Sequence, residues 1–155
     1  YDNLLVVQTF SKSRSLAGMR IGYAMGSAEL IKALNDVKYS FNSYTMDRTT
    51  IAAGVASMKD QAYFEECCNK IITTREWTKT ELKKLGFSFQ DSKANFIFAT
   101  HESCPAKKLF GALREKHIYV RYFPKDRIDN HLRITIGTDK EMKKLVEFLK
   151  EYLQK

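Results

Sequence analysis

A short segment near the beginning of the sequence places a lysine and an arginine where they could act on one ligand. Lys12 follows an apolar run at 4–7, and Arg20 comes eight residues later, directly before a second apolar segment at 21–25. The run at 4–7 is typical of a strand covered on both faces in an α/β sheet, and such sheets bind ligands at the carboxyl ends of their strands. The connection is too short for a helical crossover, so the two strands should pair antiparallel. Lys12 and Arg20 would then share one loop.

Residue chemistry alone does not assign a function to this loop, because a lysine in a serine-rich loop is usually a solvated surface charge. The pattern Ser-Lys-x-x-x-Leu-Ala-Gly-x-Arg-x-Gly-Tyr at 11–23, however, closely resembles the cofactor-lysine segment of the aspartate aminotransferase superfamily. These are pyridoxal-phosphate enzymes of fold type I, and the amino-acid sequence of residues 9–24 is most similar to their histidinol-phosphate aminotransferase branch. By this resemblance Lys12 forms the internal imine with pyridoxal 5'-phosphate, while Ser11 and Arg20 bind the cofactor phosphate.

The residue types suit these implied roles. A lysine that is partly desolvated beside a cationic site disfavours its ammonium form, which frees the amine to attack an aldehyde and later to carry a proton. The cofactor's pyridine ring acts as the electron sink, so the protein mostly orients and protonates. Arg20 can meet a phosphate with two parallel hydrogen bonds, and Ser11 adds a hydroxyl donor.

A second group of polar residues interrupts apolar segments farther along the chain. In the predicted strand 131–136, alternation places Arg133 on the face opposite the apolar side chains. Arg121 and Asn95 interrupt two other apolar segments in the same way. An arginine in such a strand is unfavourable unless it binds a carboxylate or phosphate, although solvent-facing residues of a one-sided sheet would give the same pattern.

The resemblance also covers these residues. Leu-Arg-Ile-Thr-Ile-Gly-Thr at 132–138 is similar to the superfamily's C-terminal signature, and it implies that Arg133 binds one end of the substrate. By the same resemblance Arg121 helps to bind a substrate phosphate, and Asn95, in an Ala-Asn-Phe segment, is a further substrate contact.

The implied activity is amino transfer between L-histidinol phosphate and 2-oxoglutarate in histidine biosynthesis. Another class I/II aminotransferase, or a related amino-acid-phosphate decarboxylase, stays open as an alternative. The partners expected are a small-molecule amino donor and a 2-oxo acid, with a homodimer for the full-length protein.

Composition allows one alternative of a different class. The chain has 155 residues and a net charge of +8, which can attract nucleic acid or small anions. A strand-helix-strand-strand-helix order with Phe96 and Phe98 would suit a basic RNA-binding module. The aromatic-glycine run of such modules is missing, and the basic residues do not cluster, so no nucleic-acid partner is expected.

Cysteine and histidine usage indicates neither metal nor disulfides. Three cysteines form no CxxC pair, and three histidines show no metal-ligand spacing. Reduced thiols, the lack of a signal peptide and the lack of a long apolar run lead us to expect a soluble, cytoplasmic protein without a membrane partner.

The expected fold class is α/β, with three successive parts. Residues 1–45 would be the C-terminal part of the cofactor-binding large domain, 46–86 linking helices, and 87–155 a small α+β domain. A buried-type strand begins almost at residue 1, and together with this the resemblance implies the C-terminal portion of a longer enzyme, which we expect to be inactive alone.

Local signals predict the helix ends within these parts. Ser27, Asp60 and Thr138 are predicted N-caps, and Gly86 a helix stop. A helix is expected at 28–37, followed by an irregular connector at 38–45. The helix at 60–85 should bury a stripe that includes Ile71 and Leu82, with a polar gap near Thr74. The predicted strands of the last part are 87–90, 94–99, 118–123 and 131–136.

Overall fold

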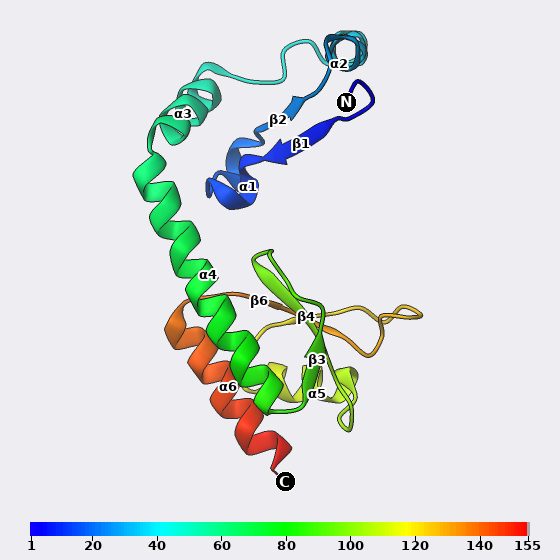
Figure 1. Ribbon diagram of the computed structural model, residues 1–155, viewed down its shortest axis with the longest axis vertical. Coiled ribbons are helices and arrows are strands. Elements are labelled where there is room, and N and C mark those ends of the chain that lie inside the picture. The colour runs from blue at the N-terminus through cyan, green and yellow to red at the C-terminus, as the bar shows by residue number, and fades with distance from the viewer. Residues whose placement is uncertain (155) are drawn as a thin grey trace. The chain divides into compact units, whose positions relative to one another are not determined.

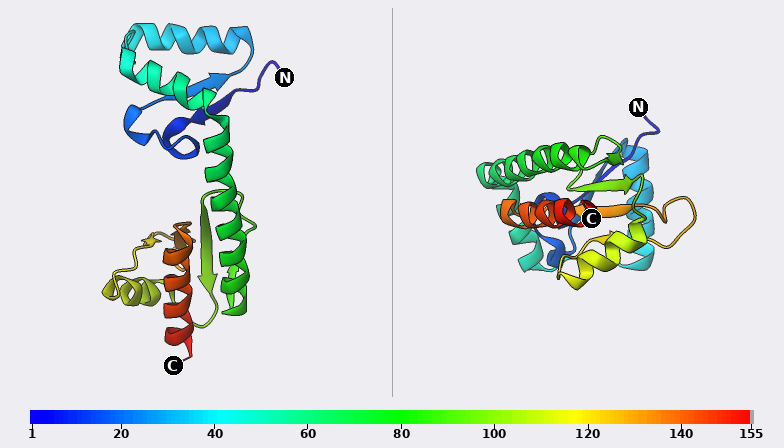
Figure 2. Two further views of the ribbon diagram at one scale, coloured as in Figure 1. Left: turned by 90° about the vertical axis from the view of Figure 1, so that its left-hand side faces the viewer. Right: turned by 90° about the horizontal axis from the view of Figure 1, so that it is seen from below.

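The computed structural model describes residues 1–154, which form two compact units (Figures 1 and 2). Unit 1 is Tyr1–Cys68 and unit 2 is Asn69–Lys155. The boundary falls inside the long helix α4 (Gln61–Lys84). No helix in the described residues is both long and apolar enough to cross a membrane.

Unit 1 consists of a hairpin interrupted by two short helical turns, followed by helices. Its elements before α4 are β1 (Val6–Thr9), α1 (Phe10–Ser13), η1 (Ala17–Met19), β2 (Gly22–Met25), α2 (Ala28–Phe41) and α3 (Arg48–Lys59). Strands β1 and β2 pair antiparallel, with Thr9 opposite Gly22, which confirms the predicted pairing. The predicted burial of the run at 4–7 is wrong for this chain, because Val7 is 69% exposed and β1 pairs only with β2 among the described residues.

Helix α2 is longer than the sequence predicted. The connector expected at 38–45 is helical as far as Phe41, and the N–H of Asn42 donates to the carbonyl of Lys38 at 2.8 Å. No proline or glycine interrupts 38–41, so nothing local ends the helix earlier.

Side-chain caps fix the helix ends as predicted. Ser27, Asp60 and Thr138 each accept a backbone N–H from the first turn of the following helix, α2, α4 or α6 (Asp139–Leu153). Thr138 completes a reciprocal capping box with Glu141. Gly86 ends α4 with a φ of +81°, a left-handed conformation that favours glycine.

Unit 2 is built on a four-stranded antiparallel sheet in the order β3-β4-β6-β5. Its remaining elements are β3 (Phe87–Phe89), β4 (Phe96–His101), α5 (Ala106–Glu115), β5 (Arg121–Tyr122) and β6 (Leu132–Thr135). Buried side chains from one face of β4 and β6 form a single core with α4, α5 and α6. The fully buried members include Leu82, Ile97, Leu113, Leu132, Ile134 and Leu149. Three helices thus cover one face of an antiparallel sheet, and two of them, α5 and α6, lie in the part at 87–155, where a sheet with helices on one face was predicted.

The strand boundaries differ from the predicted ones. The strands expected at 118–123 and 131–136 shorten to β5 and β6, and the strand expected at 94–99 lies at Phe96–His101. Strand β5 lies at the edge of the sheet, and among the described residues two of its residues pair with β6.

Helices α4 and α6 lie side by side in unit 2 (Figure 2). The Thr74 hydroxyl donates to Asp139 at 2.5 Å, and Lys150 Nζ donates to Glu81 at 2.8 Å. The predicted polar gap near Thr74 is therefore wrong: Thr74 is buried because its hydroxyl is satisfied across the helix pair. Ile71, predicted to be buried, is 36% exposed.

Candidate active site

The loop that carries Lys12 is closed at its base by backbone hydrogen bonds. The N–H of Phe10 donates to the carbonyl of Ile21 at 3.1 Å, and both side chains are buried. Within the loop, the N–H of Leu16 donates to the carbonyl of Phe10, also at 3.1 Å. The base of the loop is thus fixed, whereas the side chains of Lys12 and Arg20 are exposed.

Ser11 and Lys12 present free polar groups at the start of α1. The Thr9 hydroxyl donates to Ser11 Oγ at 2.9 Å, so the proton of the Ser11 hydroxyl is available to an external acceptor. Thr9 also accepts the N–H of Ser11 and so caps this turn. Lys12 Nζ makes no hydrogen bond or ion pair with any residue that the structure describes.

Arg20 adopts a backbone conformation that side chains rarely take. Its φ is +55°, and the left-handed conformation costs a non-glycine residue about 1–2 kcal/mol. One guanidinium nitrogen donates to the carbonyl of Ala17 at 2.8 Å, and the rest of the fork has no partner among the described residues. Backbone strain of this kind is concentrated at functional sites. The Ser11 hydroxyl and the Arg20 guanidinium are both hydrogen-bond donors, the kind of group that binds a phosphate.

Gly22 makes the close return of the chain possible. A Cβ at this position would lie 2.9 Å from the carbonyl oxygen of Gln8, which is closer than real contacts allow. Glycine is therefore required where β2 begins, directly after Ile21.

Arg121 and Arg133 are direct partners in the β5–β6 register. Cross-strand partners point to the same face, and the burial of Leu132 and Ile134 on the core side confirms the face predicted for Arg133. Arg133 Nε is buried without a hydrogen-bond partner, and neither guanidinium has a carboxylate partner among the described residues. Like charges directly opposite each other are unfavourable, so this pair suits an anion.

Aromatic rings line the same face. The Arg133 guanidinium lies 5.5 Å from the centre of the Phe96 ring, and Arg121 lies 5.6 Å from that of Phe123. The rings of Phe98 and His131 are stacked with their centres 4.7 Å apart. No single motif groups these aromatics with the arginines, although the alternation of Phe96 and Phe98 along the chain indicates that both lie on one face.

Asn95 occupies a different place from the one predicted. It lies in a bend before β4, not inside a strand, and its carbonyl accepts the N–H of Ile136 at 2.9 Å. In register, Asn95 is thus opposite Ile136 of the core, whereas Phe96 lies on the face of the arginines. The structure brings Arg121 and Arg133 together and leaves Asn95 at the end of the ladder.

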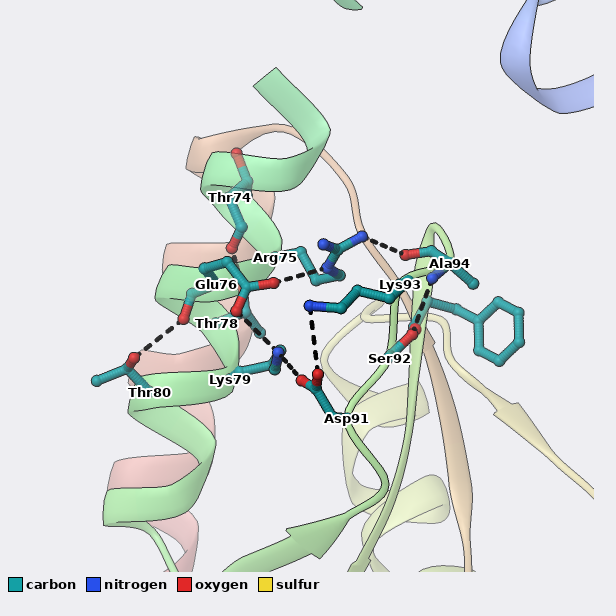
Figure 3. Close-up of polar contacts among 11 residues, drawn as sticks. Thr74, Arg75, Glu76, Thr78, Lys79, Thr80, Asp91, Ser92, Lys93 and Ala94 are labelled. Atoms are coloured by element: carbon teal, nitrogen blue, oxygen red, sulfur yellow. Dashed lines mark hydrogen bonds and ion pairs between the residues drawn. The ribbon is translucent and has the colours of Figure 1, made fainter. Parts of the chain in front are cut away.

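Charged residues of α4 hold the segment that precedes Asn95 (Figure 3). Arg75 donates to the carbonyl of Ala94 at 3.1 Å, and Lys79 donates to Asp91. The hydrogen bond from Lys79 lowers the pKa of Asp91, and the same bond raises the pKa of Lys79. The segment is therefore fixed to α4 by buried cations.

The same cations bind Glu76 on α4. Lys79 donates to this carboxylate at 2.8 Å and Arg75 donates at 3.0 Å. Their hydrogen bonds, first that of Lys79 and then that of Arg75, lower the pKa of Glu76 below its ordinary value. Arg75 and Lys79 are buried, whereas the side chains of Glu76 and Asp91 are 47% and 64% exposed, so this network lies at the surface of unit 2.

No group of three or more histidine, cysteine, aspartate or glutamate side chains is arranged to hold a metal in the described part of the chain. The groups that the structure offers to a ligand are hydroxyls, an amine and guanidinium groups. They are suited to phosphates and carboxylates, and to an aldehyde in the case of the amine.

Comparison with known proteins gives a consistent result. The family described as aminotransferase class I and II matches residues 1–149. The chain is 57% identical over 150 residues to histidinol-phosphate aminotransferase of Brachyspira hyodysenteriae, covering 97% of this chain and 42% of that protein. Identity to the protein of the same name from Clostridium acetobutylicum is 57% over 151 residues, covering 97% of this chain and 43% of that protein.

Solved structures agree. The histidinol-phosphate aminotransferase structure from Clostridium acetobutylicum matches with a TM-score of 0.89 at 25% identity, over 99% of this chain and 47% of that one. The one from Sinorhizobium meliloti, in complex with pyridoxal-5'-phosphate, matches with a TM-score of 0.83 at 27% identity, over 99% of this chain and 42% of that one. The chain thus has part of the α/β fold of these aminotransferases and spans less than half of their length. It belongs to the class I and II aminotransferase family.

Proposed function

We propose that the complete protein containing this chain is a pyridoxal-phosphate-dependent transaminase that moves an amino group between L-histidinol phosphate and 2-oxoglutarate. The observation that supports the proposal is one loop, closed at its base by the Phe10–Ile21 backbone hydrogen bond, that carries Ser11 and the exposed side chains of Lys12 and Arg20. Relatives that share 57% of their residues with this chain bear the name of that activity.

The loop residues would hold the cofactor. Pyridoxal phosphate, when bound, supplies a ring that accepts electrons from the reacting carbon. The Ser11 hydroxyl and the Arg20 guanidinium would bind its phosphate, and their unused donors fit that role. Lys12 Nζ would bond to the cofactor's aldehyde carbon, yield that place to the substrate amine, and then hold the transferred proton.

The opposed arginines of unit 2 would bind the substrate. Two guanidinium groups without carboxylate partners carry about two positive charges, and a phosphate monoester carries about −1.5 to −2 near neutral pH. A dianion therefore neutralises both Arg121 and Arg133, whereas a single carboxylate would leave part of their repulsion in place. This charge balance favours a phosphorylated amino donor. Asn95, at the end of the β4–β6 ladder, is a further proposed contact.

The proposal includes an arrangement of domains and an assembly. Residues 1–45 would end the large cofactor domain, 46–86 would form linking helices, and 87–155 the small domain. The complete enzyme would be a cytoplasmic homodimer. The 155-residue chain alone would not turn over substrate, because part of the cofactor pocket would be missing.

The direct test is an amino-transfer assay on the complete protein. Formation of glutamate from 2-oxoglutarate should depend on L-histidinol phosphate. The KM for unphosphorylated L-histidinol should be much higher than that for L-histidinol phosphate, because the unphosphorylated donor lacks the dianion that the arginine pair would bind. Release of CO2 from an amino-acid phosphate, without glutamate formation, would instead support the decarboxylase alternative and refute the proposal. Equal KM values for the two donors would refute the role of the arginine pair.

A further inference from the structure

Arg14 connects the lysine loop to the junction between α3 and α4. It follows Lys12 by two residues and is the C-cap residue of α1. Its guanidinium carbon lies 3.8 Å from the centre of the Phe64 ring, and one terminal nitrogen donates to the carbonyl of Ser57 at 2.9 Å. The other donates to Gln61 Oε1 at 3.3 Å. Arg14 therefore contacts the end of α3 and the start of α4, all within unit 1.

These contacts require an arginine. The guanidinium is planar, so it can stack on a ring and donate in its own plane to two acceptors at once, which a lysine ammonium cannot do. No described carboxylate pairs with Arg14, so the side chain is not held there by an ion pair. Its position is set by the ring and by the two oxygen acceptors.

Phe10 and Ile21 are buried at the base of the loop, whereas the end of the lysine turn contacts the α3–α4 junction through Arg14. Helix α1 has only four residues, which is too short to be stable by itself. A cavity of about 270 Å³ lies between the loop and the α3–α4 junction, and one of about 130 Å³ lies beside β1. Arg14, Phe64 and Ser13 line both hollows, so the contact between Arg14 and Phe64 borders open space. No close packing would replace it if the guanidinium were removed.

We propose that Arg14 is a positioning residue for Lys12, holding the single helical turn that carries the amine against the α3–α4 junction. The inference rests on the proposed function of Lys12. Thr9 fixes the start of the turn through the N–H of Ser11, and Arg14 fixes its end. The backbone of Lys12 thereby keeps a defined place, while its exposed side chain, with no described partner, stays available to a ligand.

The test uses the complete protein with Arg14→Met, which keeps much of the stem but removes the stacking and both donors. Arg14→Lys keeps the charge alone. Arg48→Met is the matched control, because Arg48 is an exposed arginine on α3 of the same unit. Borohydride reduction in the presence of pyridoxal phosphate, followed by mass spectrometry, gives the fraction of Lys12 that bonds to the cofactor. Turnover is then expressed per bonded Lys12.

We expect kcat per bonded Lys12 to fall about tenfold in Arg14→Met with KM unchanged, since a stacked, hydrogen-bonded guanidinium is worth about that factor. Arg14→Lys should recover little of the loss, and Arg48→Met should match the parent protein. Hydrogen exchange at the N–H groups of Ser15 and Leu16 should also be about tenfold faster in Arg14→Met.

Different failures have different meanings. An unchanged kcat per bonded Lys12 in Arg14→Met, with only a smaller bonded fraction, would show a merely structural role and overturn the inference. If Lys12 does not bond to the cofactor in the parent protein, the proposed function itself fails. Should Arg14→Met not fold, Phe64→Leu removes the ring under the guanidinium, and unchanged turnover and exchange in that variant would equally overturn the inference.

Discussion

Replacing Arg121 by glutamine should destabilise unit 2 more at high salt than at low salt. Arg121 is exposed and directly opposite Arg133, with no carboxylate to separate the charges. Like charges opposed on neighbouring strands destabilise by roughly 0.2–1 kcal/mol. The contact between Arg121 and the Phe123 ring, at 5.6 Å, is near the outer limit for a cation–π interaction and contributes about 0.5 kcal/mol.

The two effects have different salt dependences. At low ionic strength the removed repulsion offsets the lost ring contact, so the free energy of unfolding should change by only about −0.3 to +0.5 kcal/mol in Arg121→Gln. At about 1 M salt the Debye length is about 3 Å, the repulsion is screened, and the same variant should be less stable by about 0.5 kcal/mol. Urea unfolding of the 155-residue chain at both salt concentrations measures this difference.

Inorganic phosphate provides the second half of this experiment. At ten times its dissociation constant, phosphate should stabilise the parent chain by about 1.4 kcal/mol relative to chloride at equal ionic strength, by mass action. Most of this gain should disappear in Arg121→Gln. Lys144→Gln, an equal charge change on the exposed side of α6, should leave the gain intact. If Arg121→Gln loses stability equally at both salt concentrations and still responds to phosphate as the parent does, Arg121 is structural and the reasoning is refuted.

Three further predictions concern the elements that support the site. The pKa values of Glu76 and Asp91 are lowered from ordinary values of 4.5 and 3.8, so the stability that these carboxylates contribute should be complete above pH 4.5 and should be lost as pH falls further. The pKa of Lys79 is raised, so the stability that its ammonium contributes should be complete below pH 10.5 and should be lost at higher pH. Urea midpoints across pH should follow this profile, and a flat acid limb would contradict it. Gly22→Ala should cost about 1–3 kcal/mol by thermal unfolding, because its Cβ meets a carbonyl at 2.9 Å; an unchanged Tm would argue against that contact. Thr138→Ala should cost about 1 kcal/mol through the loss of the α6 cap, whereas Thr138→Ser should cost less.

Features set by neighbouring residues were predictable from the sequence. The caps at Ser27, Asp60 and Thr138 and the stop at Gly86 depend on groups within one helical turn, and all four were confirmed. The antiparallel pairing of β1 with β2 followed from the short connection between them. The outward face of Arg133 followed from alternation alone.

Features set by distant residues were not predictable in this way. Thr74 is buried because Asp139, 65 residues later, accepts its hydroxyl proton. The opposition of Arg121 and Arg133 depends on the register of a two-residue strand, which no local pattern fixes. Arg14 looks like a surface arginine in the sequence, since its acceptors lie 43 and 47 residues away. The burial expected at 4–7 failed because β2 is the one strand that pairs with β1 among the described residues.

The most direct test of the central claim is to locate the covalent bond between the complete protein and pyridoxal phosphate. After borohydride reduction and digestion, the cofactor's mass should be found on the peptide that contains Lys12, and Lys12→Ala should abolish it. Arg20→Ala should leave the bond possible but require much more cofactor to form it, because the phosphate loses its guanidinium. Cofactor bonded to a different lysine, or a yield unchanged by Lys12→Ala, would contradict the account.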